Sequence, residues 1–156
     1  MSNQPILKFE GQYRFLSNFW FAQVQLDGVY YPSVEHAYQA AKTLDPELRK
    51  PFYGPDTSAG DAKRMGKELA IRPDWNEVRL GIMEDLVRQK FEHSILQNRL
   101  LSTAPGMLIE GNYWHDQFWG DCNCVKHKDI PGENNLGKIL MKVRDEHLGA
   151  VASNYV

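Results

Sequence analysis

The sequence predicts an α+β protein, a single helix-rich domain over residues 1–156 with a small antiparallel β-hairpin or sheet. Two observations lead to this fold class. Apolar residues alternate on both sides of Asp27-Gly28, which is the pattern of a β-hairpin with a tight turn. After Ser33 the apolar residues recur at helical spacing along most of the chain. A chain of 156 residues is also long enough to bury a substantial core as one domain.

The individual elements are predicted from periodicity and from capping residues. The hairpin pairs residues 22–26 with 29–31, and Ser33 is the N-cap of the helix that follows, because Pro32 disfavours an earlier helical start. Further helices are expected at residues 46–53, 58–70, 75–91, 94–102 and 135–148, with short strands at 6–9 and 107–110. Residues 111–134 are expected to form a long loop, and such loops are more often functional than idle.

Composition excludes several function classes. The net charge of −2 provides no positive footprint for wrapping duplex nucleic acid, although a local cluster of Arg and Lys can still bind a phosphorylated ligand. We find no signal-peptide pattern and no apolar run long enough to span a bilayer. We therefore expect a cytoplasmic protein with no membrane partner.

Two cysteines raise the question of a metal. Cys122 and Cys124 are followed by His127 and preceded by His115, so a zinc site is one interpretation. The spacing differs from the common zinc motifs, and no second Cys pair completes a tetrahedral set. We therefore expect two reduced thiols and no metal.

The first candidate for chemistry is Glu35, in the first turn of the helix after Ser33. Gln39 and Lys42 follow at i+4 and i+7, so the three side chains share one helix face. This face can line a polar pocket. The structural alternative is that a carboxylate at a helix start simply interacts favourably with the helix dipole.

The second candidate is the fragment Trp119-Gly120-Asp121 in the long loop. Trp119 offers a flat face for stacking on a base, and Asp121 supplies a second carboxylate. Glu35 and Asp121 together would form the carboxylate pair that glycosidic cleavage commonly uses. The structural alternative is a core Trp beside a turn-forming Asp.

Cationic and polar residues form a third set, some of which can bind a phosphate; these are Arg14, Asn18, Lys63, Arg64, Lys67, Arg79 and Lys90. Taken individually, each of them is more often a solvated surface residue than a phosphate ligand. The chain has no Gly-rich nucleotide loop and no His-Glu-x-x-His helix, so the common kinase and zinc-protease machinery is absent.

Short motifs follow one another in order along nearly the whole chain. They are Phe15-Leu16-Ser17-Asn18-Phe19, Tyr31-Pro32-Ser33-Val34-Glu35-His36, Ala62-Lys63-Arg64-Met65-Gly66, Leu100-Leu101-Ser102-Thr103-Ala104, Trp119-Gly120-Asp121 and Asn135-Leu136-Gly137-Lys138-Ile139-Leu140-Met141. This series resembles the NADAR, or YbiA-like, domain family. The stretch 122–133 departs from the family pattern, and we expect it to influence the choice of leaving group.

The resemblance implies an N-glycosidase that cleaves a ribosyl C1–N bond without a metal or organic cofactor. Bacterial YbiA-like members act on phosphoribosylaminopyrimidines of riboflavin biosynthesis and release ribose 5-phosphate. Other members remove ADP-ribose from guanine in nucleic acid. The expected partner is thus a small phosphorylated ribosylamine. The alternatives are an ADP-ribosyl substrate, including ADP-ribosylated nucleic acid, and a non-catalytic module that binds NAD or ADP-ribose.

The resemblance also suggests catalytic roles. Glu35 would stabilise the positive charge that develops on the ribose or activate water, and Asp121 would protonate the departing nitrogen. Lys42 would pair with a phosphate or with Glu35, or its amine would trap the open-chain aldehyde as a Schiff base. The electrostatic role is favoured, since nothing in the sequence indicates a lowered pKa for this lysine.

The expected substrate-binding residues are Asn18, Gln39, Trp75, Trp119 and Arg14. Asn18 would hold a ribose hydroxyl, and Trp119 or Trp75 would stack on the heterocycle. Trp75 can instead be a buried anchor at the start of its helix.

Overall fold

The computed structural model describes residues 3–154, and its contacts divide the chain into two compact units. The central unit comprises Asn18–Lys90, and the terminal unit combines Met1–Ser17 with Phe91–Val156. Within residues 3–154 no helix is both long enough and apolar enough to cross a membrane.

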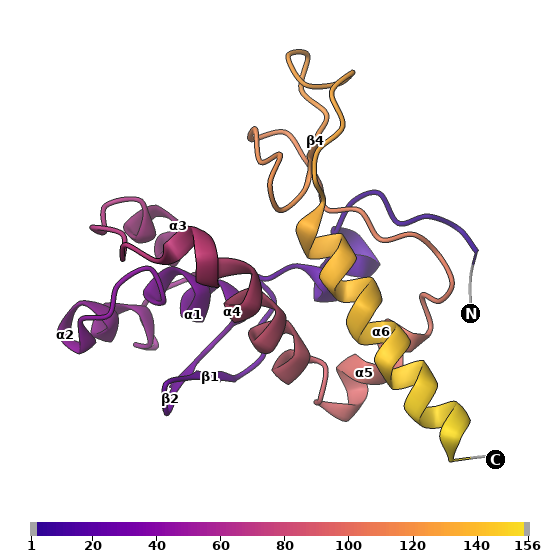
Figure 1. Cartoon of the computed structure of the whole chain (residues 1–156), viewed down its shortest axis with the longest axis horizontal. Coiled ribbons are helices and arrows are strands. Elements are labelled where there is room, and N and C mark those ends of the chain that lie inside the picture. Colours follow the sequence, from indigo (N-terminus) through magenta and orange to yellow (C-terminus); the bar gives the residue numbers. More distant parts are fainter. Residues whose placement is uncertain (1–2, 155–156) are drawn as a thin grey trace. The chain divides into compact units, whose positions relative to one another are not determined.

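The central unit consists of one hairpin and a set of helices (Figure 1). Its elements are β1 (Val24–Leu26), β2 (Val29–Tyr31), α1 (Val34–Ala40), α2 (Pro46–Arg49), η2 (Lys50–Phe52), α3 (Ala59–Gly66) and α4 (Trp75–Lys90). The hairpin is antiparallel and pairs Leu26 with Val29. Asp27 and Gly28 both have positive φ, as a tight two-residue hairpin turn requires.

Helix α1 is the buried centre of this unit. It begins where the sequence predicts, because the Ser33 hydroxyl caps it by accepting the N–H of His36 at 3.2 Å. Every residue of α1 is buried, and the helix packs against both α3 and α4. Burial on all sides means that the polar face of α1 lies inside the protein and not in bulk solvent.

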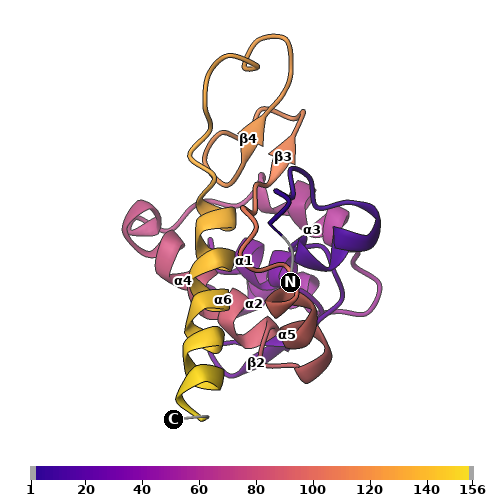
Figure 2. The ribbon, with the colours of Figure 1, turned by 90° about the vertical axis from the view of Figure 1, so that its right-hand side faces the viewer.

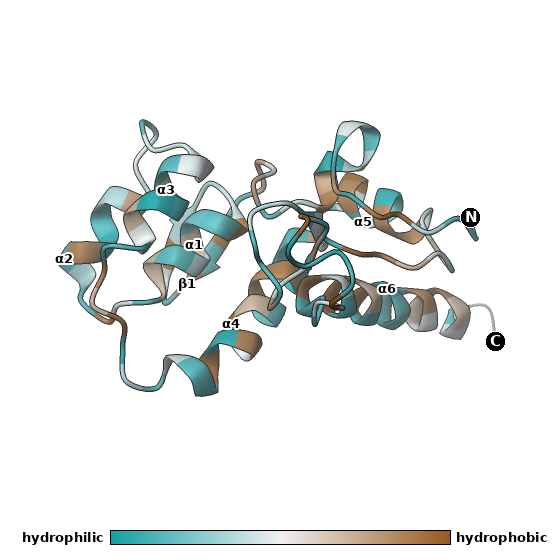
Figure 3. Cartoon of the chain, turned by 90° about the horizontal axis from the view of Figure 1, so that it is seen from above, coloured by the Kyte–Doolittle hydropathy of each residue, from teal (hydrophilic) through white to brown (hydrophobic). Residues whose placement is uncertain are grey.

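The terminal unit comprises η1 (Gly11–Leu16), α5 (Ser94–Leu101), β3 (Gly111–Asn112), β4 (Asp121–Cys122) and α6 (Asn135–Ser153). Strands β3 and β4 lie side by side as a short parallel pair (Figure 2). Apolar and polar residues alternate around α6 (Figure 3), and its apolar side faces inward. Its buried apolar residues are Leu136, Ile139, Leu140 and Val143.

The predicted fold class is confirmed, because the chain is helix-rich with a small two-stranded antiparallel sheet. Several boundaries differ. The strands expected at 6–9 and 107–110 reduce to one isolated bridge between Ile6 and Leu108, and the last helix continues to Ser153. The predicted loop 111–134 contains β3 and β4, which are too short to leave a periodic signal. The single domain over residues 1–156 stays a prediction.

Candidate functional site

Glu35 is a buried residue that forms hydrogen bonds through both its backbone N–H and its side-chain carboxylate. Its N–H donates to the carbonyl oxygen of Asn18 at 3.1 Å, and one carboxylate oxygen accepts from Gln39 Nε2 at 2.9 Å. The residue is only 7% exposed. A carboxylate whose only role is a favourable interaction with the helix dipole can stay exposed to solvent. Burying a charged group costs free energy unless the group is hydrogen-bonded. The burial therefore supports the functional interpretation of this face.

Gln39 lies at the contact between α1 and α3. Gly66 ends α3, and any Cβ at that position would overlap the Gln39 side chain. The buried Gln39 Oε1 has no hydrogen-bond partner among residues 3–154, whereas its Nε2 is used by Glu35. Gly66 lies within one of the motifs that resemble the family, but no role was predicted for it. An isolated glycine at a helix end beside a polar helix face was the available signal.

Helix α1 ends at Ala40, so Lys42 lies just beyond the helix on whose face it was predicted, and its electrostatic environment is unusual. Burial lowers the pKa of its amine, the charge of Glu35 opposes that shift, and Lys67 and Lys63 lower the pKa further. The sequence offered no sign of such a shift. Lys42 therefore lies within electrostatic range of Glu35, and its amine loses a proton more readily than the amine of an exposed lysine.

The side chains of Asn18 and Trp75 are buried in the central unit, and the contacts that they make are mainly packing contacts. Asn18 is buried, and its Nδ2 contacts Met83 Sδ at 3.5 Å while its carbonyl fixes the start of α1. Trp75 is the first residue of α4, and its ring packs on Tyr38 with centroids 5.1 Å apart. With Trp75 only 6% exposed, the structure supports the buried-anchor alternative for this residue.

His36 is engaged at both ring nitrogens. Its Nε2 lies 2.6 Å from the carbonyl oxygen of Thr57, which can only accept, so Nε2 carries the proton. Its Nδ1 then accepts from the Ser33 hydroxyl at 2.7 Å. This arrangement gives His36 a structural role in tying α1 to the segment before α3.

A cavity of about 610 Å³ opens beside α1 in the central unit. Its lining includes His36 and the aromatic side chains of Phe19, Tyr30 and Tyr53, but it does not include Glu35. The cavity and the Glu35 face are therefore distinct features of the same helix.

In the terminal unit, Asp121 and Trp119 are held by local hydrogen bonds. Asp121 Oδ1 accepts the N–H of Gly132 at 2.8 Å, and the N–H of Trp119 donates to Asp116 Oδ1 at 2.8 Å. The Trp119 ring packs edge-on against Phe118 with centroids 4.8 Å apart. Position 120 requires a glycine for packing, because a Cβ there would overlap the side chain and the backbone carbonyl of Glu110.

The predicted site residues thus divide between the two units. Glu35, Gln39, Lys42, Asn18 and Trp75 belong to the central unit, whereas Asp121, Trp119 and the exposed Arg14 belong to the terminal unit. The pairing of Glu35 with Asp121 stays a prediction.

Comparison with known proteins places this geometry in a family. The chain is 36% identical over 148 residues to a riboflavin biosynthesis protein of Vibrio vulnificus, covering 92% of this chain and 38% of that relative. It is 36% identical over 133 residues to the N-glycosidase YbiA of Escherichia coli, covering 83% of this chain and 79% of that relative.

A solved structure agrees with the sequence comparison. The NMR structure of Escherichia coli YbiA superposes with a TM-score of 0.80 at 32% identity, covering 97% of this chain and 89% of that one. A family model described as the NADAR domain matches residues 7–147, which extend over parts of both units. The predicted resemblance is confirmed, and the chain belongs to the NADAR domain family.

Proposed function

We propose that this chain is an N-glycosidase that hydrolyses the ribosyl C1–N bond of a phosphoribosylaminopyrimidine intermediate of riboflavin biosynthesis and releases ribose 5-phosphate. The observation that carries the proposal is the buried Glu35 carboxylate, hydrogen-bonded by Gln39, in a chain similar to proteins named N-glycosidase and riboflavin biosynthesis protein. Those names bear out the predicted enzyme class and point to a small substrate.

Cleavage of a C1–N bond builds positive charge on the ribose ring. A carboxylate stabilises such a state most effectively where water is excluded, and Glu35 is buried. The hydrogen bond from Gln39 Nε2 fixes the orientation of the carboxylate before the substrate arrives. In the proposed step, water oxygen bonds to C1 as the C1–N bond breaks, and Glu35 accepts a proton from that water.

The departing nitrogen must receive a proton, and Asp121 is the proposed donor. One of its oxygens already accepts the N–H of Gly132, which would fix the orientation of the carboxyl group. This role requires Asp121 to reach the leaving group in the substrate complex, and it is tested below by substitutions that separate its structural and chemical parts.

Lys42 has two proposed roles that differ in chemistry. In the first, Lys42 and its neighbours Lys63 and Lys67 attract the phosphate of the substrate. In the second, the neutral amine of Lys42 attacks C1 of the ring-opened substrate, and the C1–N bond to the pyrimidine breaks as the pyrimidine amine leaves with a proton. Water then hydrolyses the resulting lysine imine, which releases ribose 5-phosphate and restores the Lys42 amine. The lowered pKa of Lys42 supports the second role, because a larger fraction of the amine is neutral near pH 7.

The purified chain should be incubated separately with the riboflavin-pathway ribosylamine, ADP-ribosylated guanosine and NAD, and released base should be measured by chromatography. Release from the ribosylamine alone is expected. Release from ADP-ribosylated guanosine alone would replace the proposal with an ADP-ribosyl glycohydrolase. Binding of NAD or ADP-ribose with no release from any compound would indicate the non-catalytic module.

A further inference from the structure

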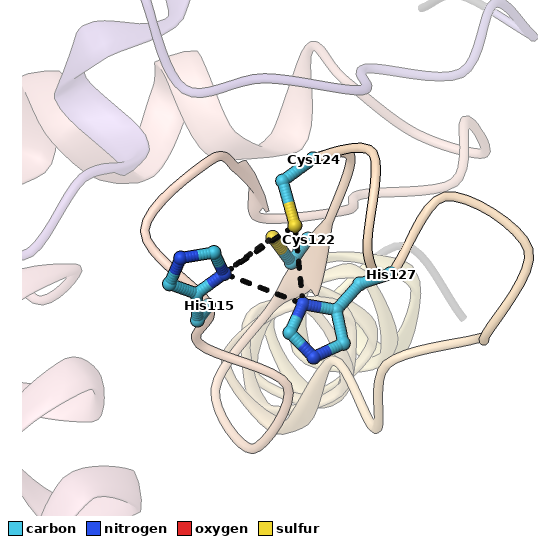
Figure 4. Close-up of side chains that lie close together, drawn as sticks. All are labelled: His115, Cys122, Cys124 and His127. Carbon is cyan, nitrogen blue, oxygen red and sulfur yellow. Dashed lines mark hydrogen bonds between the residues drawn. The ribbon is translucent and has the colours of Figure 1, made fainter.

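Four side chains of the segment 113–134 converge on one point in the terminal unit (Figure 4). They are His115, Cys122, Cys124 and His127, and one potential metal-binding atom of each lies within 4.8 Å of all the others. Cys124 Sγ lies 3.3 Å from His115 Nδ1 and 3.2 Å from His127 Nδ1, and the two Nδ1 atoms are 3.4 Å apart. Cys122 Sγ lies 3.9 Å from His115 Nδ1.

We propose that these four residues bind one Zn²⁺ ion as a tetrahedral Cys₂His₂ site that holds the segment 113–134 in place. Zinc bonds of usual length predict ligand separations of about 3.3 Å between nitrogens, about 3.6 Å between nitrogen and sulfur and about 3.8 Å between sulfurs. The distance of 3.4 Å between the two Nδ1 atoms, the distance of 3.9 Å from Cys122 Sγ to His115 Nδ1, and the distances of 3.2 and 3.3 Å from Cys124 Sγ to the two Nδ1 atoms are close to that geometry, and all pairs lie within 4.8 Å.

The backbone positions the first two ligands without help from a metal. Pairing of β3 with β4 places Asn112 opposite Cys122 and closes residues 113–120 into a loop that carries His115. The Asn112 side chain clamps this loop through two hydrogen bonds to the backbone of Asp116, at 2.8 and 3.1 Å. The loop is therefore fixed at the residue that follows His115.

A tight turn positions the other two ligands. The N–H groups of His127 and Lys128 both donate to the carbonyl oxygen of Cys124, at 3.0 and 2.8 Å. This turn places the Cys124 thiol and the His127 imidazole on the same side. The backbone of His115 has φ of 70°, a conformation that non-glycine residues seldom adopt. Such a conformation persists where the surrounding structure requires it.

The segment has little apolar packing of its own to maintain this convergence. Four of its large apolar side chains, Tyr113, Trp114, Val125 and Ile130, are exposed, with Val125 at 89%, whereas Phe118 and Trp119 are half-buried. A metal site replaces a hydrophobic core in small structural modules. A closed set of two thiolates and two imidazoles, with no carboxylate in the set, is typical of structural zinc and unlike the oxygen ligands that magnesium or calcium prefer.

This inference departs from the expectation of two metal-free thiols. The sequence templates for zinc require paired Cys-x-x-Cys or His-x₃₋₅-His spacings, whereas here the ligands follow as His-x₆-Cys-x-Cys-x₂-His. The sequence shows the four residues, but only the pairing of β3 with β4 shows that His115 lies beside Cys122 and that the four side chains meet.

The first test measures bound metal directly. The untagged chain should be purified from cells grown with zinc, dialysed without chelator, and analysed by mass spectrometry for metals. One Zn²⁺ per chain is expected, and Cys124→Ser and His127→Ala should each retain less than a tenth of it. His93→Ala is the matched control, since His93 lies outside the cluster, and it should keep the full amount.

The second test reports the ligands and does not depend on how the variants fold. Co²⁺ added to the zinc-free wild-type chain should produce the intense visible absorption of tetrahedral Co²⁺ and a near-ultraviolet thiolate-to-cobalt band. Stoichiometric Zn²⁺ should remove both. Hydrogen exchange in residues 113–134 should slow when Zn²⁺ is restored.

Clear outcomes would overturn the proposal. They are a wild-type chain that carries no stoichiometric zinc and gives only the weak spectrum of six-coordinate Co²⁺, or an intact mass that shows Cys122 and Cys124 joined as a disulfide. Equal zinc in wild type and Cys124→Ser would mean adventitious binding elsewhere.

Discussion

Gln39 Nε2 donates a 2.9 Å hydrogen bond to Glu35 Oε1, one helical turn away on α1. Both residues are buried, so the hydrogen bond forms where water competes little. The Oε1 atom of Gln39 lies close to Gly66, the last residue of α3, where a Cβ would overlap it. The Glu35 carboxylate is therefore held by a chain of close contacts that continues into a neighbouring helix, and each link can be tested separately.

Replacing Glu35 by Gln should lower kcat by about 10²-fold or more, because a neutral amide cannot stabilise the developing positive charge. The substrate Kd, measured by calorimetry, should change little, since the shape is preserved. Glu47→Gln on α2 is the control, as that carboxylate is exposed. Wild-type kcat in Glu35→Gln would rule out the proposed role.

Gly66→Ala should destabilise the chain by about 1–3 kcal/mol, because the new methyl group overlaps Gln39 in a packed interface. Urea unfolding is the measurement. Gly60→Ala in the same helix is the matched control: its Cβ would meet only Ser58 Oγ at 3.9 Å, so helix propensity should leave stability unchanged or raise it. The double variant Gly66→Ala/Gln39→Ala should recover most of the stability that Gly66→Ala loses. If the changes in unfolding free energy of the two single variants simply add in the double variant, the contact between these residues is contradicted.

Lys42→Arg separates the two roles of Lys42, because arginine keeps the charge but cannot form an imine at neutral pH. If the amine is a nucleophile, Lys42→Arg should lose activity by more than about 10²-fold, and borohydride added during turnover should trap a ribose adduct on the wild type. If the role is electrostatic, Lys42→Arg should keep substantial activity and no adduct should form. Lys63→Arg is the control for general effects of the substitution.

The same lysine predicts a pH dependence. A group that acts as a neutral amine becomes active as pH rises through its pKa, and burial places the pKa of Lys42 below 10.5. If Lys42 acts as the neutral amine, kcat should therefore rise with pH with a midpoint below that value. In Lys42→Arg this rise should vanish, and its persistence would assign it to another group.

Asp121→Asn and Asp121→Ala distinguish structure from proton transfer. Asparagine can still accept the Gly132 N–H that Asp121 Oδ1 accepts at 2.8 Å, whereas alanine cannot. If Asp121 is the proton donor, both variants should lose about 10²-fold or more in kcat. If it only holds the loop, Asp121→Asn should remain active and Asp121→Ala alone should lose stability.

Lys90 should make stability depend on pH. It is 1% exposed, and burial lowers its pKa to about 7. Between about pH 7 and 10.5 the unfolded chain binds this proton and the folded chain does not, so the contribution of Lys90 to stability rises with pH. The free energy of unfolding of Lys90→Met, measured with urea, should therefore exceed that of the wild type by the largest amount below pH 7 and by the smallest amount above pH 10.5. The exposed Lys50→Met should show no such trend.

Local chemistry allowed part of this structure to be predicted. Asp27 and Gly28 specify a tight turn whatever surrounds them, and Ser33 caps a helix through its own hydroxyl. The placement of Glu35 and Gln39 on one helix face follows from helical periodicity alone. For these features the interacting groups lie within four residues of one another.

The sequence by itself determined the order of the helices, the hairpin turn and the helix face that Glu35 and Gln39 share. Only the tertiary structure decided that Glu35 is buried, that the pKa of Lys42 is lowered, and that two histidines and two cysteines converge. Burial and electrostatic shifts depend on which distant segments exclude water from a group. Because those segments come together only when the chain folds, no local pattern in the sequence records them.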